Sequence, residues 1–212
     1  MKYKREEVVS NLYETSKSRE DNKYLLSKSA EIYEVYHLDK LKEKFCEYYR
    51  HSDNIKSCDA YYYDQYNNLV IEFKNAHHMK MREYYDEIEM KMLDTHMLLS
   101  ETLWKNRKTK DIAKKVNLIV VYNDAMNCGK GLCAIGSALN DMKPIQGNQS
   151  RNTNNPKIFE NEEEYKKRIA ETKEKYQTDF YKEIDFIDKK DFETDYINSG
   201  YFTTLEIWSE IC

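Results

Sequence analysis

The chain contains little of several residue types whose abundance would mark a particular structural class. Only 5 glycines and 2 prolines occur among 212 residues, which excludes collagen-like, glycine-rich and proline-rich chains. The longest apolar run, Leu118–Tyr122, has the length of a strand and falls far short of the roughly 18 residues that indicate a transmembrane helix. Residues 1–20 lack the continuous apolar segment of a secretory signal.

Cysteine is sparse, and its positions indicate no disulfide framework. The five residues are odd in number and scattered along the chain, at Cys46, Cys58, Cys128, Cys133 and Cys212. Free thiols fit a reducing compartment, so the sequence favours a cytoplasmic location. Because Cys128 and Cys133 lack a second pair of ligands, we interpret both as ordinary thiols rather than as a zinc site.

Positive charge is not in excess either. Lys and Arg total 34 against 38 Asp and Glu, which gives a formal net charge of −4. Phosphate binding needs clustered positive charge, so this balance argues against a generally cationic nucleic-acid coat protein but permits a local basic groove. A hydrophobic fraction of 40% with 13% aromatic residues is typical of a folded chain and not of a disordered one. We expect a single domain over residues 1–212.

Hydrophobic periodicity predicts a mixed α/β fold in which a central mixed β-sheet is flanked by helices. Residues 5–50 show mostly helical spacing, with Asp39 as the expected N-cap of the last helix in this region. Two short stretches rich in aromatic and β-branched residues follow, at 55–64 and 69–75. They are expected to form a hairpin around a loop at 65–68.

The second half of the chain is expected to continue this fold. A helical pattern at 77–104, with Glu and Lys interspersed on its expected solvent-facing side, precedes an apolar run at 116–122 that has the signature of an interior strand. A charged helix at 159–181 and one or two edge strands within 184–197 follow. Residues 126–212 are otherwise a helical or irregular C-terminal extension, to which the sequence assigns no role.

The hairpin places three residues of chemical interest on one face. If residues 65–68 form the loop, Asp59 lies opposite Lys74, and Tyr61 lies opposite Glu72. Side chains alternate along strands, so Asp59, Glu72 and Lys74 then share one face, and a two-residue turn preserves the same arrangement. The apolar residues between them fall on the opposite face.

Two carboxylates and an amine on one face suit metal-assisted hydrolysis of a phosphodiester. Carboxylate oxygens are hard ligands for Mg²⁺ or Mn²⁺, and a metal so held polarises the phosphodiester and lowers the pKa of a bound water. The Lys74 ammonium would orient that water or neutralise the charge that develops on the phosphate. The alternative is a chance Glu-x-Lys on a solvated strand face, where charges alternate in the same way.

Asp59 followed by Glu72-Phe73-Lys74 on the next strand resembles the pattern of the PD-(D/E)xK nuclease superfamily, which has the restriction-endonuclease-like fold. The resemblance covers roughly residues 30–125, where the expected order of helix, hairpin, helix and buried strand also fits. It implies that Asp59 and Glu72 ligate the metal, with the Phe73 carbonyl as a further ligand. It also implies that Lys74 is the catalytic lysine.

Two features depart from the family pattern. Cys58 stands where the family has proline, and the helix after the hairpin lacks the Gln-x-x-x-Tyr motif of the RecB-like exonuclease branch. Many members add an acid from the preceding helix, for which Glu43 and Glu47 are both candidates. The same fold also has inactive members, so the fold by itself does not establish activity.

Other polar groups near the hairpin admit two interpretations. A basic cluster before the 116–122 strand could bind a phosphate backbone or form a solvated turn. It comprises Lys105, Arg107, Lys108, Lys110, Lys114 and Lys115. The adjacent His77 and His78 would diverge on a helix, so the sequence favours ordinary surface histidines over a shared metal site.

These observations lead to the hypothesis of a metal-dependent phosphodiesterase that hydrolyses nucleic acid, with DNA as the expected substrate. Asp59, Glu72 and Lys74 would carry the reaction, with Mg²⁺ or Mn²⁺ as cofactor. A second hypothesis is a non-catalytic interaction protein on the same fold, such as a toxin-neutralising immunity protein or an accessory subunit of a defence system, because a small acidic protein suits a basic partner. A third is a structural α/β domain in which the motif is a coincidence.

Overall fold

A computed structural model describes residues 4–18, 22–50, 55–64, 66–105, 116–125, 158–177 and 179–202. Within these ranges, six strands form one mixed sheet in the order β1-β2-β3-β4-β5-β6. The strands are β1 (Val9–Asn11), β2 (Glu34–His37), β3 (Ala60–Tyr63), β4 (Asn68–Phe73), β5 (Asn117–Tyr122) and β6 (Glu183–Asp188). The first four strands pair antiparallel, whereas β4, β5 and β6 run parallel to one another. The predicted mixed α/β class is confirmed.

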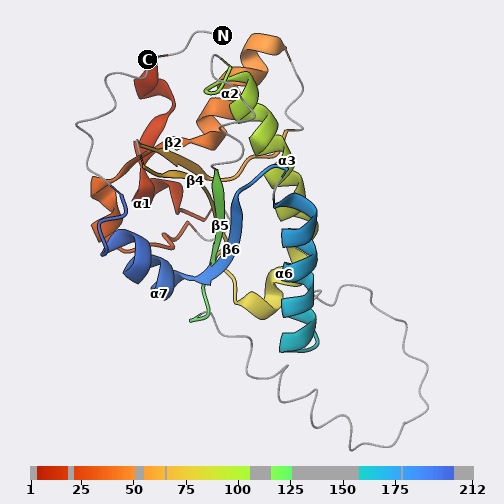
Figure 1. Cartoon of the computed structure of the whole chain (residues 1–212). Coiled ribbons are helices and arrows are strands. Elements are labelled where there is room, and N and C mark those ends of the chain that lie inside the picture. Colours follow the sequence, from red (N-terminus) through yellow and green to blue (C-terminus); the bar gives the residue numbers. More distant parts are fainter. Residues whose placement is uncertain are drawn as a thin grey trace, which may run out of the picture.

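Helices cover both faces of this sheet. The described helices are α1 (Leu12–Thr15), α2 (Leu38–Tyr49), α3 (Tyr85–Glu101), α6 (Glu162–Tyr176) and α7 (Lys189–Phe192), with 3₁₀ turns η1 (Arg5–Glu7), η2 (Lys28–Ile32) and η3 (His78–Glu83) and a π-helical turn η4 (Glu193–Ile197). Figure 1 shows α3 and α6 on one side of the sheet and α1 and α7 on the other. Parallel neighbours need a crossover connection, and α3 and α6 lie in the connections from β4 to β5 and from β5 to β6.

The central strands are buried on both faces, as strands covered by helices on two sides usually are. Every residue of β4 except Phe73 is buried, and so are four consecutive residues of β5, Leu118–Val121. The interior strand predicted at 116–122 is therefore confirmed. The burial of β4 also places a charged residue of that strand, Glu72, inside the protein.

The hairpin forms, but its register differs from the prediction by two residues. Tyr62 pairs with Leu69, and the Asp59 N–H donates to the Ile71 carbonyl at 3.0 Å, so Asp59 does not lie opposite Lys74. A shift of two residues leaves every side chain on its predicted face, because side chains alternate with a period of two. Glu72 and Lys74 therefore keep their predicted common face despite the error.

The turn of the hairpin accounts for the shift. The Asp64 carboxylate accepts the backbone N–H groups of Tyr66 at 2.7 Å and Asn67 at 2.6 Å, and its own N–H donates to the Asn67 carbonyl at 2.9 Å. Strand β3 therefore ends at Tyr63 and β4 begins at Asn68. An Asp that bonds to the backbone ahead of it favours a turn, whereas the prediction had placed Asp64 in the strand.

The N-terminal region differs most from its prediction. The described part of residues 5–50 contains the strands β1 and β2, and its longest helix is α2. The N-cap of α2 is His37. Asp39 lies in the first turn instead, where its carboxylate binds Lys42 and Ser57. Strands of three or four residues are too short for their period to be separated from a helical one.

The C-terminal region combines confirmed and wrong predictions. Strand β6 confirms an edge strand at 184–187, whereas residues 192–197 are helical and not a second edge strand. The charged helix expected at 159–181 is α6, and the helical pattern at 77–104 corresponds to η3 followed by α3.

Two further expectations concern cysteines and membrane spans. Cys46 and Cys58 are buried and form no disulfide within the described part of the chain, and the other three cysteines lie outside it. None of the helices in the described ranges combines the length and the apolar character that crossing a bilayer requires.

Candidate active site

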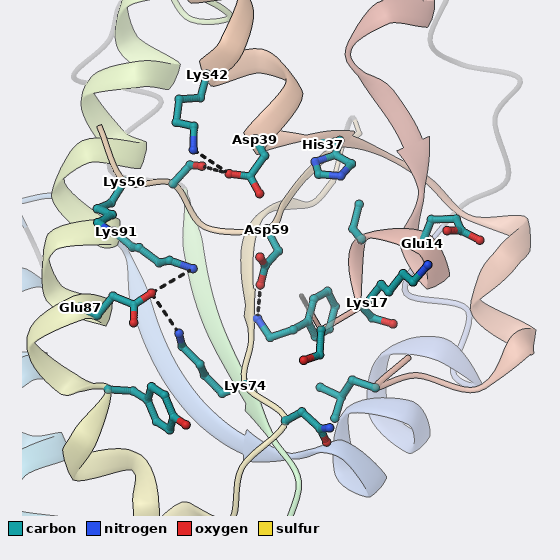
Figure 2. A pocket seen from close by; sticks show the side chains of 18 of the residues that line it. Glu14, Lys17, His37, Asp39, Lys42, Lys56, Asp59, Lys74, Glu87 and Lys91 are labelled. Atoms are coloured by element: carbon teal, nitrogen blue, oxygen red, sulfur yellow. Dashed lines mark hydrogen bonds and ion pairs between the residues drawn. The ribbon is translucent and has the colours of Figure 1, made fainter. Parts of the chain in front are cut away.

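The fold brings Asp59, Glu72 and Lys74 together where β4 ends and β3 begins. The backbone N–H of Asp59 donates to the Ile71 carbonyl at 3.0 Å, which fixes Asp59 at the start of β3. Its carboxylate accepts the backbone N–H of Phe73 at 2.6 Å, as Figure 2 shows. The Lys74 Nζ lies 3.2 Å from Glu72 Oε1. The predicted common face therefore holds for Glu72 and Lys74, and Asp59 meets the same end of β4 through the Phe73 backbone.

Glu72 is the most deeply buried member of the group, with 0% of its surface exposed. Its Oε1 lies 2.8 Å from Lys91 Nζ as well as 3.2 Å from Lys74 Nζ. Its Oε2 has no hydrogen-bond partner within the described part of the chain. A solvated strand face is excluded at this position. An unpartnered buried polar atom costs roughly 1–3 kcal/mol, so the arrangement is not one that stability alone would favour.

Helix α3 adds two charged residues that were expected on its solvent-facing side. Glu87 Oε1 lies 3.3 Å from Lys74 Nζ and 3.7 Å from Lys91 Nζ. The Lys91 side chain is only 15% exposed, because it turns toward the sheet. With every group ionised, the carboxylates of Asp59, Glu72 and Glu87 outnumber the two ammonium groups by one negative charge.

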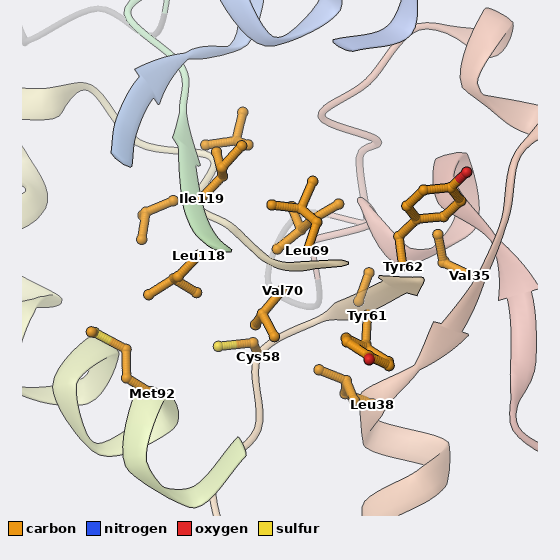
Figure 3. Packing of buried hydrophobic residues seen from close by; sticks show 14 of the residues in the cluster. Val35, Leu38, Cys58, Tyr61, Tyr62, Leu69, Val70, Met92, Leu118 and Ile119 are labelled. Atoms are coloured by element: carbon orange, nitrogen blue, oxygen red, sulfur yellow. The ribbon is translucent and has the colours of Figure 1, made fainter. Parts of the chain in front are cut away.

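Apolar residues cover the same face of the sheet next to these charges. Figure 3 shows Cys58 and Val70 on the side of the sheet that faces Met92 of α3, and all three are fully buried. The Cys58 N–H donates to the Thr95 hydroxyl at 2.8 Å, which ties the strand to α3. Burial, followed by the charge of Glu72, raises the pKa of the Cys58 thiol. The Glu72 carboxylate therefore lies in dry surroundings, whereas Asp59 is partly exposed.

These surroundings shift the protonation equilibria of the charged residues. Burial, followed by the charge of Glu72, raises the pKa of Asp59 to about 8, although Lys91 opposes the shift. Burial alone would lower the pKa of Lys91, but the charges of Glu72 and Asp59 outweigh it and raise that pKa. Burial opposes ionisation of Glu87, yet Lys74 and Lys91 hold its pKa below the usual value. Without a further cation, Asp59 therefore holds a proton at neutral pH.

The Phe73 carbonyl, a predicted ligand, is directed to the Asp59 side of β4. The N–H and C=O groups of one strand residue point to the same edge of the strand, and the Phe73 N–H binds Asp59. The next residue, Lys74, donates its N–H to the Val121 carbonyl at 2.8 Å, on the opposite edge. Asp59 and the Phe73 carbonyl therefore approach the same space.

Helix α2 contributes an acid to the site, but not one of the two expected. Glu43 and Glu47 are exposed, whereas Asp39 lines the same pocket as Asp59. Asp39 Oδ1 lies 3.0 Å from Lys42 Nζ and accepts the Ser57 hydroxyl at 2.8 Å.

Asp59 and Lys74 open into a pocket of about 780 Å³, across which Lys17 and Glu14 face them (Figure 2). The lysines that line it are Lys17, Lys40, Lys42, Lys56, Lys74 and Lys91. The acids that line it are Glu14, Asp39, Asp59 and Glu87. Six positive and four negative groups give the lining a formal charge of +2, whereas the whole chain carries −4.

Of the predicted basic cluster, only the first residue, Lys105, lies within the described part of the chain. Lys105 is exposed, donates to the Tyr49 hydroxyl at 3.3 Å and lies 3.7 Å from Glu101. It does not line the pocket. Outside the described residues lie Arg107, Lys108, Lys110, Lys114 and Lys115, and also Cys128 and Cys133.

Three charged residues of the site were not predicted from the sequence as members of it: Asp39, Glu87 and Lys91. A signal existed for two of them, because Glu87 and Lys91 are spaced by four on a helix and such residues pair. The same spacing is common on solvated helices, so only packing against β4 distinguishes this pair.

Comparisons of the chain with protein-family models, with curated proteins and with solved structures found no match.

Proposed function

We propose that the chain is a metal-dependent phosphodiesterase that hydrolyses nucleic acid, in which Asp59 and Glu72 hold Mg²⁺ or Mn²⁺ and Lys74 assists. The observation that carries this proposal is that Asp59 and Lys74 open into a pocket that six lysines line, beside the buried Glu72 that pairs with Lys74. DNA is the expected substrate, and RNA is the alternative that the experiment below includes.

The carboxylates fit a hard divalent cation. Glu72 carries a buried oxygen without a partner among the described residues, and Asp59 ionises only at raised pH. A cation between them would replace the proton of Asp59 and offset the excess negative charge, with the Phe73 carbonyl as a neutral oxygen ligand. Bound there, Mg²⁺ would supply Lewis-acid chemistry, which polarises a phosphodiester and lowers the pKa of a bound water.

The two lysines of the site have different positions and therefore different roles. Lys74 Nζ lies between Glu72 and Glu87 at the pocket wall, where an ammonium would stabilise the charge that develops on a phosphate. Lys91 makes the shorter contact to Glu72, at 2.8 Å. It acts as a positioning residue, because this contact holds the Glu72 carboxylate in place.

The charge of the pocket supports a polyanionic substrate. Lys17, Lys40 and Lys56 also line it, and lysines bind phosphates as point charges. A local positive charge in a chain that is acidic overall attracts nucleic acid to this surface and not to the rest of the molecule.

The order of the elements is compatible with the PD-(D/E)xK resemblance. Helix α2, the β3–β4 hairpin, α3 and β5 follow one another as that core requires, and β5 lies parallel to β4. Strand β2 is a departure, since it precedes α2 and pairs with β3. The resemblance therefore supports the proposal chiefly through Asp59 and Glu72-Phe73-Lys74 at adjacent strand ends.

The test is cleavage of linear, circular and single-stranded DNA and of RNA in the presence of Mg²⁺ or Mn²⁺. We expect the wild-type chain to cut and Lys74→Ala to lose about 100-fold or more in rate, because a charge that stabilises the transition state is removed. Lys173→Ala is the matched control, since it removes a lysine paired with Asp185 at 3.0 Å outside the pocket. Full activity in a folded Lys74→Ala protein would contradict the assigned centre.

One observation favours a second candidate, a non-catalytic interaction protein. Lys91 already places an ammonium 2.8 Å from Glu72, so a lysine supplies part of the positive charge that a metal would supply. Calorimetry separates the two candidates. The nuclease takes up Mg²⁺ or Mn²⁺ and loses this binding in the Asp59→Asn/Glu72→Gln double variant, whereas the interaction protein binds neither ion at this site and cuts no substrate.

A further inference from the structure

A second group of metal-ligating side chains lies beyond the carboxyl ends of β4 and β5. His77 and His78 follow β4, and Asp124 follows β5. Parallel neighbours end at the same edge of a sheet, and the backbone N–H of Asn123 donates to the Ala76 carbonyl at 2.9 Å. The two segments are therefore held side by side. None of the three ligating residues lines the pocket described above.

The ligand atoms of these residues converge. His78 Nδ1 lies 2.7 Å and His77 Nε2 lies 3.7 Å from Asp124 Oδ1, and one ligand atom from each residue falls within 4.8 Å of the others. The divergence expected of two adjacent helical residues is not observed, because His77 is the extended N-cap of η3, with φ −64° and ψ 144°. The two rings stack instead, with centroids 4.4 Å apart.

Surrounding contacts fix Asp124 and His78. The backbone N–H of Asp124 donates to the Asp188 carboxylate at 2.8 Å, at the end of β6. The backbone N–H of His78 donates to Asp124 Oδ1 at 3.0 Å. The rings of Tyr122 and Tyr165 lie 5.8 Å and 5.0 Å from the His78 ring. Ligands held in this way lose little freedom when they bind an ion.

His78 has a carboxylate at each ring nitrogen. Its Nε2 lies 2.9 Å from Glu162 Oε2, in the first turn of α6, while its Nδ1 faces Asp124. A neutral imidazole carries one N–H and donates to only one of these carboxylates. The other contact needs an additional positive charge, which is either a second proton or a metal. A metal at Nδ1 leaves Nε2–H to donate to Glu162, and metal-bound histidines are generally held by such a carboxylate.

We propose that His77, His78 and Asp124 bind a single Zn²⁺-class ion and that Glu162 orients His78 for this role. Two imidazoles and one carboxylate select borderline transition metals over Mg²⁺. The Asp124 side chain is 37% exposed, so water can reach the fourth coordination position. This site goes beyond the proposed function, because it shares no ligand with Asp59 and Glu72 and does not depend on them.

Binding requires two small adjustments. The 2.7 Å contact between His78 Nδ1 and Asp124 Oδ1 opens to about 3.3 Å, which is the separation of ligands in a tetrahedral site with bonds of about 2.0–2.1 Å. His77 Nδ1 accepts the Met79 N–H at 3.2 Å, and this bond is lost when Nε2 ligates and the ring proton occupies Nδ1.

The test is a titration of the full chain, freed of metal, with Co²⁺, followed by the visible absorption of tetrahedral Co²⁺ and by displacement with Zn²⁺. We expect the wild-type protein to bind one ion at this site and excess Mg²⁺ to leave it bound. His78→Gln and Asp124→Asn should weaken binding by more than about 100-fold, and Glu162→Gln by about 10-fold. Asp86→Asn, the same change at a carboxylate that is 91% exposed, should have no effect.

The Asp59→Asn variant separates this site from the proposed catalytic site, because it should bind Co²⁺ as the wild-type protein does. Far-UV circular dichroism verifies that each variant is folded. If His78→Gln does not fold, the Co²⁺ affinity of the milder Glu162→Gln variant tests the proposal instead. The proposal is overturned if the wild-type protein binds no Co²⁺, or if folded variants of His78, Asp124 and Glu162 bind it as tightly as the wild-type protein.

Discussion

Two groups of charged side chains lie at the carboxyl ends of the parallel strands, and they are neutralised in different ways. The carboxylate cluster comprises Asp59, Glu72, Lys74, Glu87 and Lys91. The histidine cluster comprises His77, His78, Asp124 and Glu162. In the first, lysines of the chain itself compensate a glutamate that is 0% exposed. In the second, a histidine lies between two carboxylates that are 37% and 51% exposed.

Burial explains this difference. A buried charge must be compensated by groups fixed in the fold, because removing water from it costs several kcal/mol. A charge at the surface keeps part of its hydration and can exchange its partner for a proton, a metal or water. Removing a charge from the carboxylate cluster should therefore lower the free energy of unfolding. Removing one from the histidine cluster should lower the affinity for a ligand.

The largest change in the free energy of unfolding is expected from a substitution of Glu72. Glu72→Gln removes the charge that compensates Lys91 and should lower the free energy of unfolding by about 3–5 kcal/mol, as breaking a buried ion pair does. Adding Lys91→Met should recover a large part of this loss, because the uncompensated ammonium is removed as well. Urea unfolding of the two single variants and the double variant gives the coupling between the residues.

Glu47→Gln is the control for this measurement. Its carboxylate is 71% exposed and lies 3.6 Å from Lys44, so its loss should change the free energy of unfolding by less than about 0.5 kcal/mol. A Glu72→Gln protein as stable as this control would mean that the buried charges of the carboxylate cluster are not compensated as the distances indicate.

The sequence could predict one part of the carboxylate cluster and not the other. Asp59, Glu72 and Lys74 come from one hairpin, and the alternation of side chains decides the face of Glu72 and Lys74 even when the register is shifted by two residues. Lys91 and Asp39 come from helices, and their direction depends on how α3 and α2 pack against the sheet. Local periodicity carries no information about that packing, so Lys91 was assigned to solvent.

The histidine cluster was missed for a related reason. The prediction treated His77 and His78 as helical neighbours, but a 3₁₀ turn begins at His78 and leaves His77 extended. Asp124 lies 46 residues further along the chain than His78, and it is brought near only by the parallel pairing of β4 with β5. The sequence indicated the strand of Asp124 but not its neighbour in the sheet.

A change of pH is expected to have an intermediate effect, which acts on the affinity of the carboxylate cluster for Mg²⁺. The pKa of Asp59 is raised from 3.8 to about 8, so below pH 8 a proton competes with the metal for this carboxylate. The affinity for Mg²⁺ should rise by up to about tenfold per pH unit toward pH 8 and level off above it. Calorimetry between pH 6 and 9 measures this slope. Binding that is independent of pH would contradict a role for Asp59 as ligand.

The same pKa predicts the sign of a stability effect in the chain without metal. The folded state holds the Asp59 proton more tightly than the unfolded state, so the free energy of unfolding should fall as pH rises from about 4 to about 8, by at most about 1.4 kcal/mol per unit. Asp59→Asn should show a shallower fall. Asp59→Asn changes no other ionisable side chain, so equal slopes in the two proteins would argue against the raised pKa of Asp59.

The smallest change in the free energy of unfolding is expected from a substitution in the histidine cluster in the absence of metal. His78→Gln removes contacts to Asp124 and Glu162, both of which are more than a third exposed, so it should lower the free energy of unfolding by less than about 1 kcal/mol. With Zn²⁺ at about 100 times its dissociation constant, the wild-type protein should gain about 2.7 kcal/mol, and His78→Gln should gain little. If His78→Gln without metal lost as much free energy of unfolding as Glu72→Gln, His78 would be a fixed part of the fold. The histidine cluster would then be compensated within the chain, as the carboxylate cluster is, and the contrast between the two would disappear.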